Sequence, residues 1–524
     1  MGRKKISLIE NNVHMSSYPP LPLFEAYMYW VITVGAILYL TICVLQASAD
    51  YRGVLNLYDF SAGWSVLDQD KGMDVSNFEW LFFCEWYNSA FPWYIGHIVL
   101  GKATEVSFSQ HKKLTLTLYS LICLYNIMGW EIMFIMSTHC LVIFMSAQFH
   151  SRKIVWVVSL LLLTPLNFEP WISWMKSMVV DDEEERWFYV LMYTLTLANI
   201  RYTSFAIEKC DFAEATKPQS ERGEMGYSLA DMVFYIFYFP LFFNGPIITY
   251  NLFSKQFGLQ LEWTKERVVS HIVFFLRIMA WAFFNEFLLH YLYFGALQQN
   301  IPAMESLSLW ALMGIGYWQG QFFMNKYHVM FGLPSNIAKI DNFDPPKGPK
   351  CIGYIYLYSD MWKHFDRGLY SFLKRYIYIP LGGSRSGLLR QTLGSFCCFT
   401  YIFYWHGAAY NIFIWSLLNF IGITLENVGK HISKSSVMEK FQRENISPVA
   451  VRRLHASITV PLLMASMLGT FCFLDGHTIS YIFYQRLIIE GWPMSWLLIF
   501  IFLYSLIQVS MEIHRKQEMK LKTS

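Results

Sequence analysis

Apolar stretches that approach or reach the length of a membrane-crossing helix recur along the whole chain. A helix needs about 20 predominantly apolar residues to cross the hydrocarbon core of a bilayer. Within that core every backbone N–H and C=O group must be hydrogen-bonded inside the protein, which restricts spanning segments to helices and closed barrels. Apolar runs of this length predict helices. The thirteen stretches cover residues 28–46, 86–101, 114–130, 131–148, 154–170, 187–206, 229–250, 268–294, 306–324, 391–406, 408–424, 456–474 and 491–513.

The composition excludes a soluble protein. Charged residues make up 15% of the 524 residues, whereas a soluble domain carries roughly 25%. Aromatic residues make up 18%, and no soluble chain of this size could bury so much apolar surface in one core. The net charge of +3 is too small for a nucleic-acid-binding protein, and nine cysteines spread over a long chain are no disulfide framework. We therefore expect an all-α polytopic membrane protein.

The charges between the stretches predict which loops face the cytosol, because short loops rich in Lys and Arg stay on that side. With the N-terminus in the cytosol, the acidic loop 47–79 falls on the lumenal side. The next loop, which holds Lys102, Lys112 and Lys113, then falls on the cytosolic side, and the acidic run Asp181–Glu185 is lumenal. Charge and position therefore agree over the first part of the chain.

The alternation fails if residues 229–250 cross the membrane, since the basic loops that follow would become lumenal. Pro240, Asn244, Gly245 and Pro246 interrupt this stretch, and proline breaks the helical hydrogen-bond ladder. Irregular backbone at membrane depth is tolerated where protein surrounds it. We therefore predict that this stretch is re-entrant.

These assignments predict one transmembrane domain, 28–513, between a cytosolic segment, 1–27, and a basic cytosolic tail, 514–524. The domain contains about 10–12 transmembrane helices plus one or more re-entrant segments. The loops 325–390 and 425–455 are expected in the cytosol.

Two lysines near the C-terminus indicate a compartment. Lys520 and Lys522 stand in the final sequence Lys-Leu-Lys-Thr-Ser. This arrangement resembles a dilysine retrieval signal of the endoplasmic reticulum, which is read from the cytosol; a solvated basic tail is the alternative. We expect the endoplasmic reticulum membrane, with the Golgi as a second location.

His406 is the sharpest candidate for chemistry. It stands in Phe403-Tyr-Trp-His-Gly407, between two apolar stretches. Ionisable groups inside membrane segments are expensive and therefore functional candidates. A neutral imidazole is cheaper to bury than a charge and titrates near neutrality, which suits a general base. A hydrogen-bonded structural histidine is the alternative reading of the same residue.

A segment rich in aromatic and charged residues lies about forty positions before His406. It runs from Met361 to Ser384, and its one carboxylate in the middle is Asp366. Cations at the cytosolic face suit a phosphorylated ligand. The positive-inside rule alone also supplies such cations, so the assignment of each one to a ligand is a hypothesis. The four cations are Lys363, Arg367, Lys374 and Arg375.

These two features together resemble the membrane-bound O-acyltransferase (MBOAT) superfamily. The resemblance rests on an isolated His in an apolar segment, on a preceding Trp-x-x-Phe-Asp and on Arg-Tyr-x-Tyr-Ile-Pro-x-Gly-Gly. It spans about residues 75 to 510 and is strongest from Cys351 to Asn419. Most members carry Asn at the position of Asp366, and this departure is typical of the hedgehog acyltransferase branch. Further shared motifs are Phe78-Glu-Trp80, Tyr202-Thr-Ser-Phe205, Asn244-Gly-Pro246 and Gly491-Trp-Pro493.

The resemblance implies the MBOAT fold, with a catalytic region at about 325–424. It implies transfer of palmitate from palmitoyl-CoA to the N-terminal cysteine of a secreted hedgehog-type protein, with formation of an amide. By position it makes His406 and Asp366 the catalytic residues, and it puts Trp362 beside the acyl chain. It also implies haem b, held through Cys351. A related branch lacks the histidine and is thought inactive; the presence of His406 separates this chain from it.

The residues leave several alternatives open. His406 could remove the proton of the acceptor amine or donate a hydrogen bond to the thioester oxygen. Asp366 could orient the imidazole, directly or through water, or hold polar groups of coenzyme A. The acceptor could instead be a serine of another secreted protein or a lipid hydroxyl. A proton-coupled transporter, with His406 and Asp366 as its substrate site, is the alternative outside the family.

Overall fold

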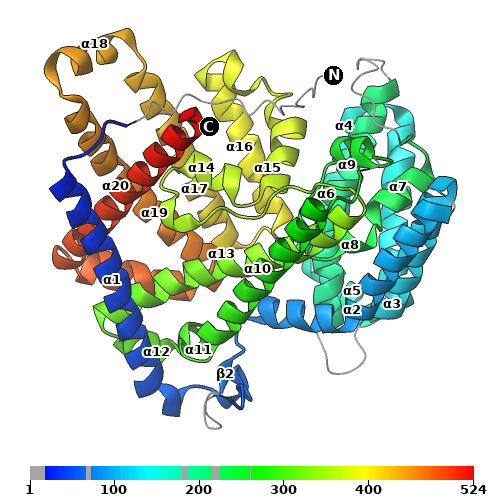
Figure 1. Cartoon of the computed structure of the whole chain (residues 1–524), viewed down its shortest axis with the longest axis horizontal. Helices are drawn as coiled ribbons and strands as arrows, with labels where there is room; N and C mark the ends of the chain where they lie inside the picture. Colours follow the sequence, from blue (N-terminus) through cyan, green and yellow to red (C-terminus); the bar gives the residue numbers. More distant parts are fainter. Residues whose placement is uncertain are drawn as a thin grey trace.

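The computed structural model describes residues 18–66, 72–107, 109–179, 186–213, 225–259 and 261–523, and these are almost entirely helical (Figure 1). Two short strands, β1 (Phe60–Ser61) and β2 (Met73–Asp74), pair antiparallel. The acidic run Asp181–Glu185 and the side chain of Lys522 lie outside the described residues. The helices are α1 (Leu23–Asp50), α2 (Phe78–Ser107), α3 (Lys112–Ser146), α4 (Arg152–Leu163), α5 (Glu169–Val179), α6 (Arg186–Ala213), α7 (Leu229–Ile236), α8 (Phe239–Phe242), α9 (Tyr250–Gln256), α10 (Lys265–Leu289), α11 (Phe294–Gln299), α12 (Ile301–Ser306), α13 (Leu309–Ile340), α14 (Tyr358–His364), α15 (Arg367–Leu373), α16 (Leu388–Trp405), α17 (Tyr410–Ser433), α18 (Ser436–Asn445), α19 (Pro448–Tyr484) and α20 (Met494–Thr523).

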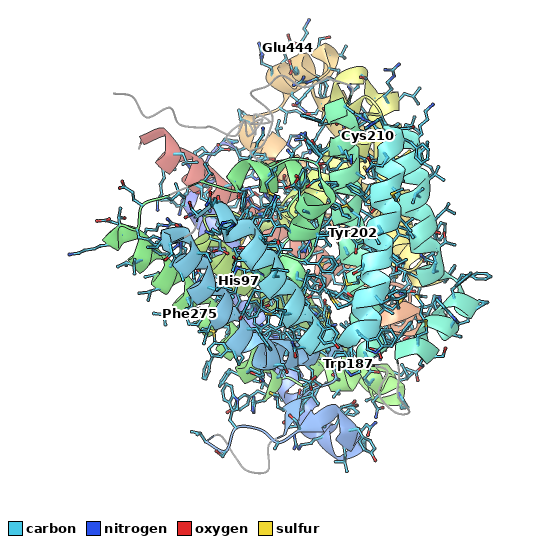
Figure 2. All side chains as sticks on the ribbon, turned by 90° about the vertical axis from the view of Figure 1, so that its right-hand side faces the viewer. His97, Trp187, Tyr202, Cys210, Phe275 and Glu444 are labelled. Carbon is cyan, nitrogen blue, oxygen red and sulfur yellow. The ribbon has the colours of Figure 1, made fainter. Side chains whose placement is uncertain are left out.

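The predicted all-α polytopic fold is confirmed. In the described residues, six helices are long and apolar enough to cross a membrane, or up to seven if the bent pair α4 and α5 counts as one span. The sequence predicted about 10–12. Part of the difference comes from helices such as α6, which extends along the height of the molecule from Trp187 to Cys210 (Figure 2). Its buried Arg201 and Glu208 lower its hydropathy below that of a simple span.

Two long helices each contain an interruption at a glycine. In α19, Gly476 has a φ of 76°, which a residue with a side chain rarely adopts. Phe471 and Phe483, on either side of it, stack with ring centroids 4.2 Å apart, whereas twelve residues of straight helix span about 18 Å. The chain therefore folds back at Gly476. In α3, Gly129 has a φ of 82°, at the boundary between the two apolar stretches that were predicted there.

Residues 229–250, which the sequence predicts to be re-entrant, fold back on themselves, and we call them the re-entrant segment. The helix breaks between α7 and α8, and irregular backbone follows up to α9. The hydroxyl of Tyr250 donates to the carbonyl oxygen of Gly226, and the hydroxyl of Tyr235 donates to that of Ile248 at 2.6 Å. The end of the segment thus returns to its start. Nearly all of its side chains are buried, as irregular backbone at membrane depth requires.

The predictions for two loops and for one apolar stretch differ in part from the structure. Residues 325–340 continue α13 as a helix instead of starting a cytosolic loop, and most of 425–455 is helical, in α17, α18 and the start of α19. The stretch 154–170 is not one straight helix, because α4 and α5 meet at 78°. A prediction from hydropathy ends a helix at the first cluster of polar residues. It contains no information on whether those residues have partners elsewhere in the fold.

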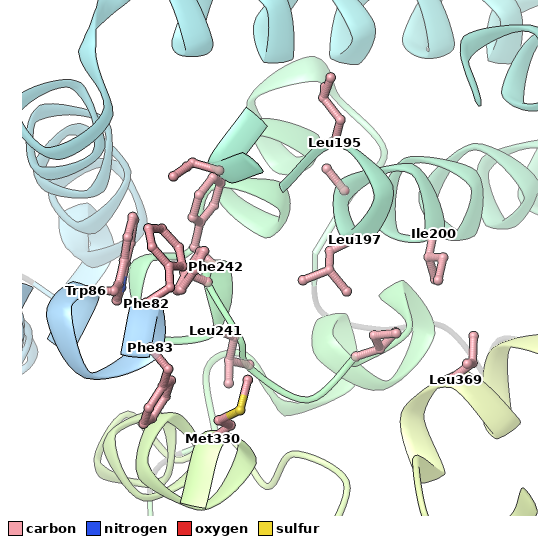
Figure 3. Packing of buried hydrophobic residues seen from close by; sticks show 14 of the residues in the cluster. Phe82, Phe83, Trp86, Leu195, Leu197, Ile200, Leu241, Phe242, Met330 and Leu369 are labelled. Atoms are coloured by element: carbon pink, nitrogen blue, oxygen red, sulfur yellow. The ribbon is translucent and has the colours of Figure 1, made fainter. Parts of the chain in front are cut away.

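The core gathers around the re-entrant segment. Figure 3 shows Phe82 and Trp86 of α2 beside Phe242 of α8, with side chains of α6, α13 and α15 around them. The rings of Trp86 and Phe243 stack with centroids 4.0 Å apart. Burial of aromatic side chains of this size stabilises the packing of neighbouring elements. The re-entrant segment therefore fixes α2, α6, α13 and α15 relative to one another.

The two sides of the molecule are distinguishable. Figure 1 shows the C-terminus and α18 at one end, and β2, α11 and α12 at the opposite end. The sequence prediction assigns the first end to the cytosol and the second to the lumen. We call these ends the cytosolic side and the lumenal side.

Candidate active site

A cavity of about 670 Å³ lies between the helices. Its wall is formed mainly by α2, α6, the re-entrant segment, α13, α14, α15, the turn between α16 and α17, α17 itself, α19 and α20. Most of its lining is apolar or aromatic, which is typical of a ligand pocket. Apart from four tyrosines, the ionisable or amide side chains that line it are Asn77, Glu79, Gln319, Gln321, Lys326, Asp366, His406 and Asn419.

His406 lines this cavity from a tight turn. It ends α16, and its backbone N–H bonds to the carbonyl of Ile402 at 3.0 Å. Gly407 follows with a φ of 101° and Ala408 with a φ of 48°. Positive φ at Gly407 costs nothing in the absence of a Cβ atom, so the chain reverses at once into α17. The glycine next to the histidine, which the sequence singled out, makes the turn that holds the imidazole at the cavity.

Aromatic rings surround the imidazole of His406. Its ring centroid lies 4.5 Å from that of Trp405, 5.5 Å from that of Trp415 and 5.0 Å from that of Phe473, with the planes nearly perpendicular. Within the described residues, its side chain has no hydrogen-bond partner. The reading as a hydrogen-bonded structural histidine therefore has no support from the described residues, and both ring nitrogens are available to a ligand.

Asp366 lines the same cavity as the N-cap of α15. Its Oδ1 accepts the backbone N–H of Leu369 at 2.8 Å, and the backbone N–H of Gly368 also bonds to this carboxylate. Capping by Asp satisfies backbone donors that the first turn of a helix leaves free. Among the described residues, no hydrogen bond joins Asp366 to His406. The two residues thus share a cavity, and direct orientation of the imidazole by Asp366 is not observed.

Gly368 sets the position of Asp366. A Cβ atom at Gly368 would overlap the carbonyl oxygen of Ile247 in the re-entrant segment. The first turn of α15 therefore packs directly on irregular backbone, an approach that only glycine permits. This contact brings the N-cap carboxylate of α15 to the cavity.

Trp362 also lines the cavity and is linked to His406 through one ring. Its indole N–H donates to Asn419 Oδ1 at 3.0 Å, which fixes the indole against α17. Its ring centroid lies 5.7 Å from that of Trp415, the same ring that contacts His406. The tryptophan that the family resemblance puts beside an acyl chain is therefore one ring away from the histidine.

None of the four predicted cations lines the cavity, and two of them have partners of their own elsewhere. Arg375 Nε donates to Glu208 Oε1 of α6 at 2.8 Å, and Lys374 lies over the ring of Tyr370 at 5.8 Å. Neither residue lines the cavity. The Arg375–Glu208 pair ties the segment that follows α15 to α6, which gives this cation a packing role in the structure.

The other two cations belong to or border a basic cluster, which we define as Lys350, His364, Arg367 and His514. The backbone N–H of Lys350 bonds to the carbonyl of His364 at 2.9 Å. His364 Nδ1, Arg367 Nε and His514 Nδ1 are buried without a hydrogen-bond partner among the described residues. Burial lowers the pKa of His364, and the charges of Arg367 and Lys350 lower it further. Lys363 lies at the edge, 3.6 Å from Asp360.

Cys351 stands between α13 and α14, next to the basic cluster. It is partly buried, burial raises the pKa of its thiol, and the Gly353 backbone N–H bonds to its sulfur. No group of three metal-ligating side chains occurs in the described part of the chain. A lone accessible sulfur with an amide donor nevertheless fits a single-thiolate iron ligand, since coordination deprotonates a thiol and amide donors tune such sulfurs. Haem at this residue stays a prediction.

The sequence reasoning missed an ion pair at the lumenal end of the cavity. Lys326 Nζ of α13 lies 2.5 Å from Glu79 Oε2 of α2, and the two side chains are only 4% and 20% exposed. The hydroxyl of Tyr327 donates to Glu79 Oε1 at 2.6 Å, and Lys326 donates to Asn77 Oδ1 at 3.2 Å. In the sequence, Glu79 stands shortly before the apolar stretch 86–101, and Lys326 stands just after the stretch 306–324. A basic residue and an acidic residue near the ends of apolar stretches were the available signal.

Comparison with known proteins adds the relatives of the chain. Residues 144–469 match the membrane-bound O-acyltransferase family. The chain is 30% identical to the protein-cysteine N-palmitoyltransferase HHAT of Mus musculus, over 82% of this chain and 86% of that protein. It is 26% identical to the HHAT-like protein of Mus musculus, over 94% and 96% of the two chains. It is 26% identical to the protein-cysteine N-palmitoyltransferase Rasp of Drosophila melanogaster, over 81% and 82%.

Proposed function

This chain belongs to the membrane-bound O-acyltransferase family, in its hedgehog acyltransferase branch, and is an acyltransferase; we propose that it transfers palmitate from palmitoyl-CoA to the N-terminal cysteine of a secreted hedgehog-type protein. The observation that carries the proposal is the meeting of His406 and Asp366 in one apolar cavity. The names of two relatives, both protein-cysteine N-palmitoyltransferases, supply the acyl group and the acceptor residue. Membership of an acyltransferase family disfavours the transporter alternative.

The proposed reaction requires the removal of a proton from the acceptor amine. An α-amino group has a pKa of about 7.7–8.0, so most acceptor molecules arrive as ammonium ions at neutral pH. Once deprotonated, the nitrogen attacks the thioester carbonyl carbon, the C–N bond forms and the C–S bond breaks. The leaving thiolate of coenzyme A takes the second proton from the nitrogen, which leaves an amide and a thiol. The cysteine thiol can also be acylated first and pass the acyl group to its own amine.

His406 and Asp366 are the residues that perform this proton transfer. The imidazole lies among aromatic edges without a hydrogen-bond partner in the described residues, so one nitrogen can accept a proton while the other N–H faces the thioester oxygen. A positioned base of this kind contributes typically ~10²–10⁴-fold to the rate. One carboxylate oxygen of Asp366 caps α15 by accepting a backbone N–H. Its negative charge favours an ammonium ion, and later a protonated imidazole, in the same cavity.

The donor fits the cytosolic part of the site. The apolar wall beside Trp362 suits a palmitoyl chain, and the basic cluster around Arg367 lies at the cytosolic end, where its unpartnered donors suit the phosphates of coenzyme A. Lys363 adds a further cation at the edge of this cluster. Lys374 and Arg375, with their own partners, lie outside the proposed donor site. Haem, where bound, would be held by the Cys351 thiolate as an iron ligand of the cytosolic loop, outside the transfer chemistry.

We propose the endoplasmic reticulum membrane as the location. The chain crosses a membrane several times, and the dilysine arrangement at Lys520 and Lys522 is the sequence feature that favours this compartment over the Golgi. Acyl-CoA would reach the site from the cytosol, and a secreted protein would present its N-terminus from the lumen. The cavity lining reaches from Phe365 and Asp366, which are next in sequence to members of the basic cluster, to Glu79, and this extent suits two substrates that arrive from opposite sides.

The test uses purified protein in detergent, labelled palmitoyl-CoA and a peptide that begins with cysteine. The same peptide with an acetylated N-terminus is the control. Label transferred only to the free N-terminus, in a form that resists hydroxylamine, supports an amide-forming protein-cysteine palmitoyltransferase. Binding of palmitoyl-CoA without transfer to either peptide would overturn the proposed acceptor, and serine peptides and lipid alcohols are then tested as acceptors.

A further inference from the structure

The Glu79–Lys326 pair lines the cavity at its lumenal end, where no step of the proposed reaction uses it. A buried ion pair is weak support for stability, because the cost of desolvating both charges offsets most of their attraction. Apolar side chains of the same volume would pack at least as well. Lys326 is almost wholly buried, and Glu79 is mostly so. The presence of this ion pair in the cavity is therefore better explained by a functional role than by a contribution to the stability of the fold.

The surroundings of the pair allow Glu79 to exchange its cation. If Lys326 leaves Glu79, it still has Asn77 Oδ1 at 3.2 Å, and it lies over the rings of Phe323 and Tyr327 at 5.4 and 5.8 Å. Cations are attracted to aromatic faces at such distances. Glu79 meanwhile keeps the hydroxyl of Tyr327. A second cation can thus replace Lys326 on the carboxylate without leaving either charge unpartnered.

Glu79 and Asp366 belong to one electrostatic environment. Both carboxylates line the same cavity as the buried Tyr193, and both lie close enough to that side chain to interact with it electrostatically. Gln319, a further lining residue on α13, has a buried Oε1 with no hydrogen-bond partner among the described residues. A peptide that enters from the lumen would therefore meet one carboxylate for a positive terminus and one amide oxygen for a backbone N–H.

We infer that Glu79 receives the terminal ammonium group of the acceptor polypeptide, which displaces Lys326 from the carboxylate, and that this exchange selects acceptors with a free N-terminus. The inference rests on the proposed function, since it concerns the acceptor of that reaction. The ammonium group enters a site of low polarity, where it would otherwise lose its hydration without compensation. Glu79 is a binding residue in this account, and proton removal belongs to Asp366 and His406 deeper in the cavity.

The test compares the wild type with Glu79→Gln and with the double variant Glu79→Gln/Lys326→Met. The double variant leaves no unpaired buried cation, so it remains informative where the single variant fails to fold. Glu85→Gln is the matched control, because Glu85 lies on the same helix and does not line the cavity. Loss of a hydrogen bond to a charged group should raise the KM for a peptide that begins with cysteine roughly 10- to 100-fold. The kcat and the KM for palmitoyl-CoA should stay within about threefold.

A direct measurement of acceptor-peptide binding tests the role of Glu79 independently of the proposed transfer reaction. Labelled peptides with and without the first amino group are titrated against the wild type and the double variant. Preference for the free amine in the wild type, lost in the double variant, supports the inference even where no amide is formed. An unchanged KM for the acceptor, or equal binding of both peptides by the wild type, would overturn it. If the wild type transfers palmitate and Glu79→Gln leaves the acceptor KM unchanged, the proposed function stands and only the role of Glu79 is refuted.

Discussion

Replacement of Asp366 by Asn separates the structural role of this side chain from its chemical role. The carboxylate caps α15 through the backbone N–H of Leu369. Asn caps a helix about as well as Asp, whereas Ala costs about 0.5–2 kcal/mol of stability. Asp366→Asn should therefore leave the thermal midpoint of the purified protein nearly unchanged, and Asp366→Ala should lower it. The capping role alone gives no reason to bury an ionisable group in the membrane.

The catalytic effect expected of the same change is much larger than the structural one. If the charge takes or holds the proton of the acceptor amine, its removal lowers kcat by roughly 10²–10⁴-fold. This factor corresponds to about 2.7–5.4 kcal/mol in the activation free energy. The loss of a cap destabilises the folded state but leaves turnover per folded molecule intact. A fall in kcat of this size in Asp366→Asn, at an unchanged midpoint, can then be assigned to the charge.

The assay is palmitoyl transfer to a cysteine-initiated peptide at saturating concentrations of both substrates, with thermal unfolding measured on the same preparations. Binding of palmitoyl-CoA is measured separately and should be retained in Asp366→Asn. A kcat of this variant within threefold of the wild type would refute the reasoning. Asp366 would then act through hydrogen bonds that Asn also makes, and proton removal would rest on His406.

Further changes test other parts of the site. His406→Ala should abolish transfer while palmitoyl-CoA binding is retained; normal turnover by this variant would exclude the imidazole from catalysis. Gly368→Ala should cost about 1–3 kcal/mol of stability and lower kcat, because its Cβ meets the backbone of Ile247, whereas Gly35→Ala, in open space on α1, serves as the tolerated control in thermal unfolding. Cys351→Ala should remove the visible absorbance of haem from the purified protein, and absorbance that persists in this variant would rule out Cys351 as the ligand.

Of the site residues that the sequence singled out, three line the cavity, namely His406, Asp366 and Trp362, whereas Lys363, Arg367, Lys374, Arg375 and Cys351 do not. His406 and Asp366 were singled out by an isolated histidine, a motif resemblance and a lone carboxylate, and both line the cavity. Their spacing of forty residues could not predict how they meet. That depends on the turn at Gly407 and on the close approach of Gly368 to the re-entrant segment, which are properties of the packed backbone.

Two of the failures, those at Lys326 and Arg375, share one physical cause, which is the pairing of charges between distant segments. Lys326 follows an apolar stretch, which predicts a cytosolic loop, yet it lies within α13 because Glu79, far away in the sequence, compensates its charge. Arg375 fits a phosphate site by its sequence, yet it is held by Glu208 of α6. A count of local charge treats each cation as solvated. Only the folded structure shows that each of these cations already has a carboxylate as its partner.

The distribution of charge along the cavity suggests why the two substrates need not compete for one mouth. Buried donors without partners among the described residues gather around Arg367, next in sequence to the lining residue Asp366, whereas the Glu79–Lys326 pair lines the cavity at its lumenal end. Phosphates prefer the first environment, and an ammonium ion prefers the carboxylate of the second. Between them, Trp362, Trp415 and His406 form a continuous contact of rings. Changes at one end should therefore alter the KM of one substrate, and only changes near this central contact should alter kcat for both.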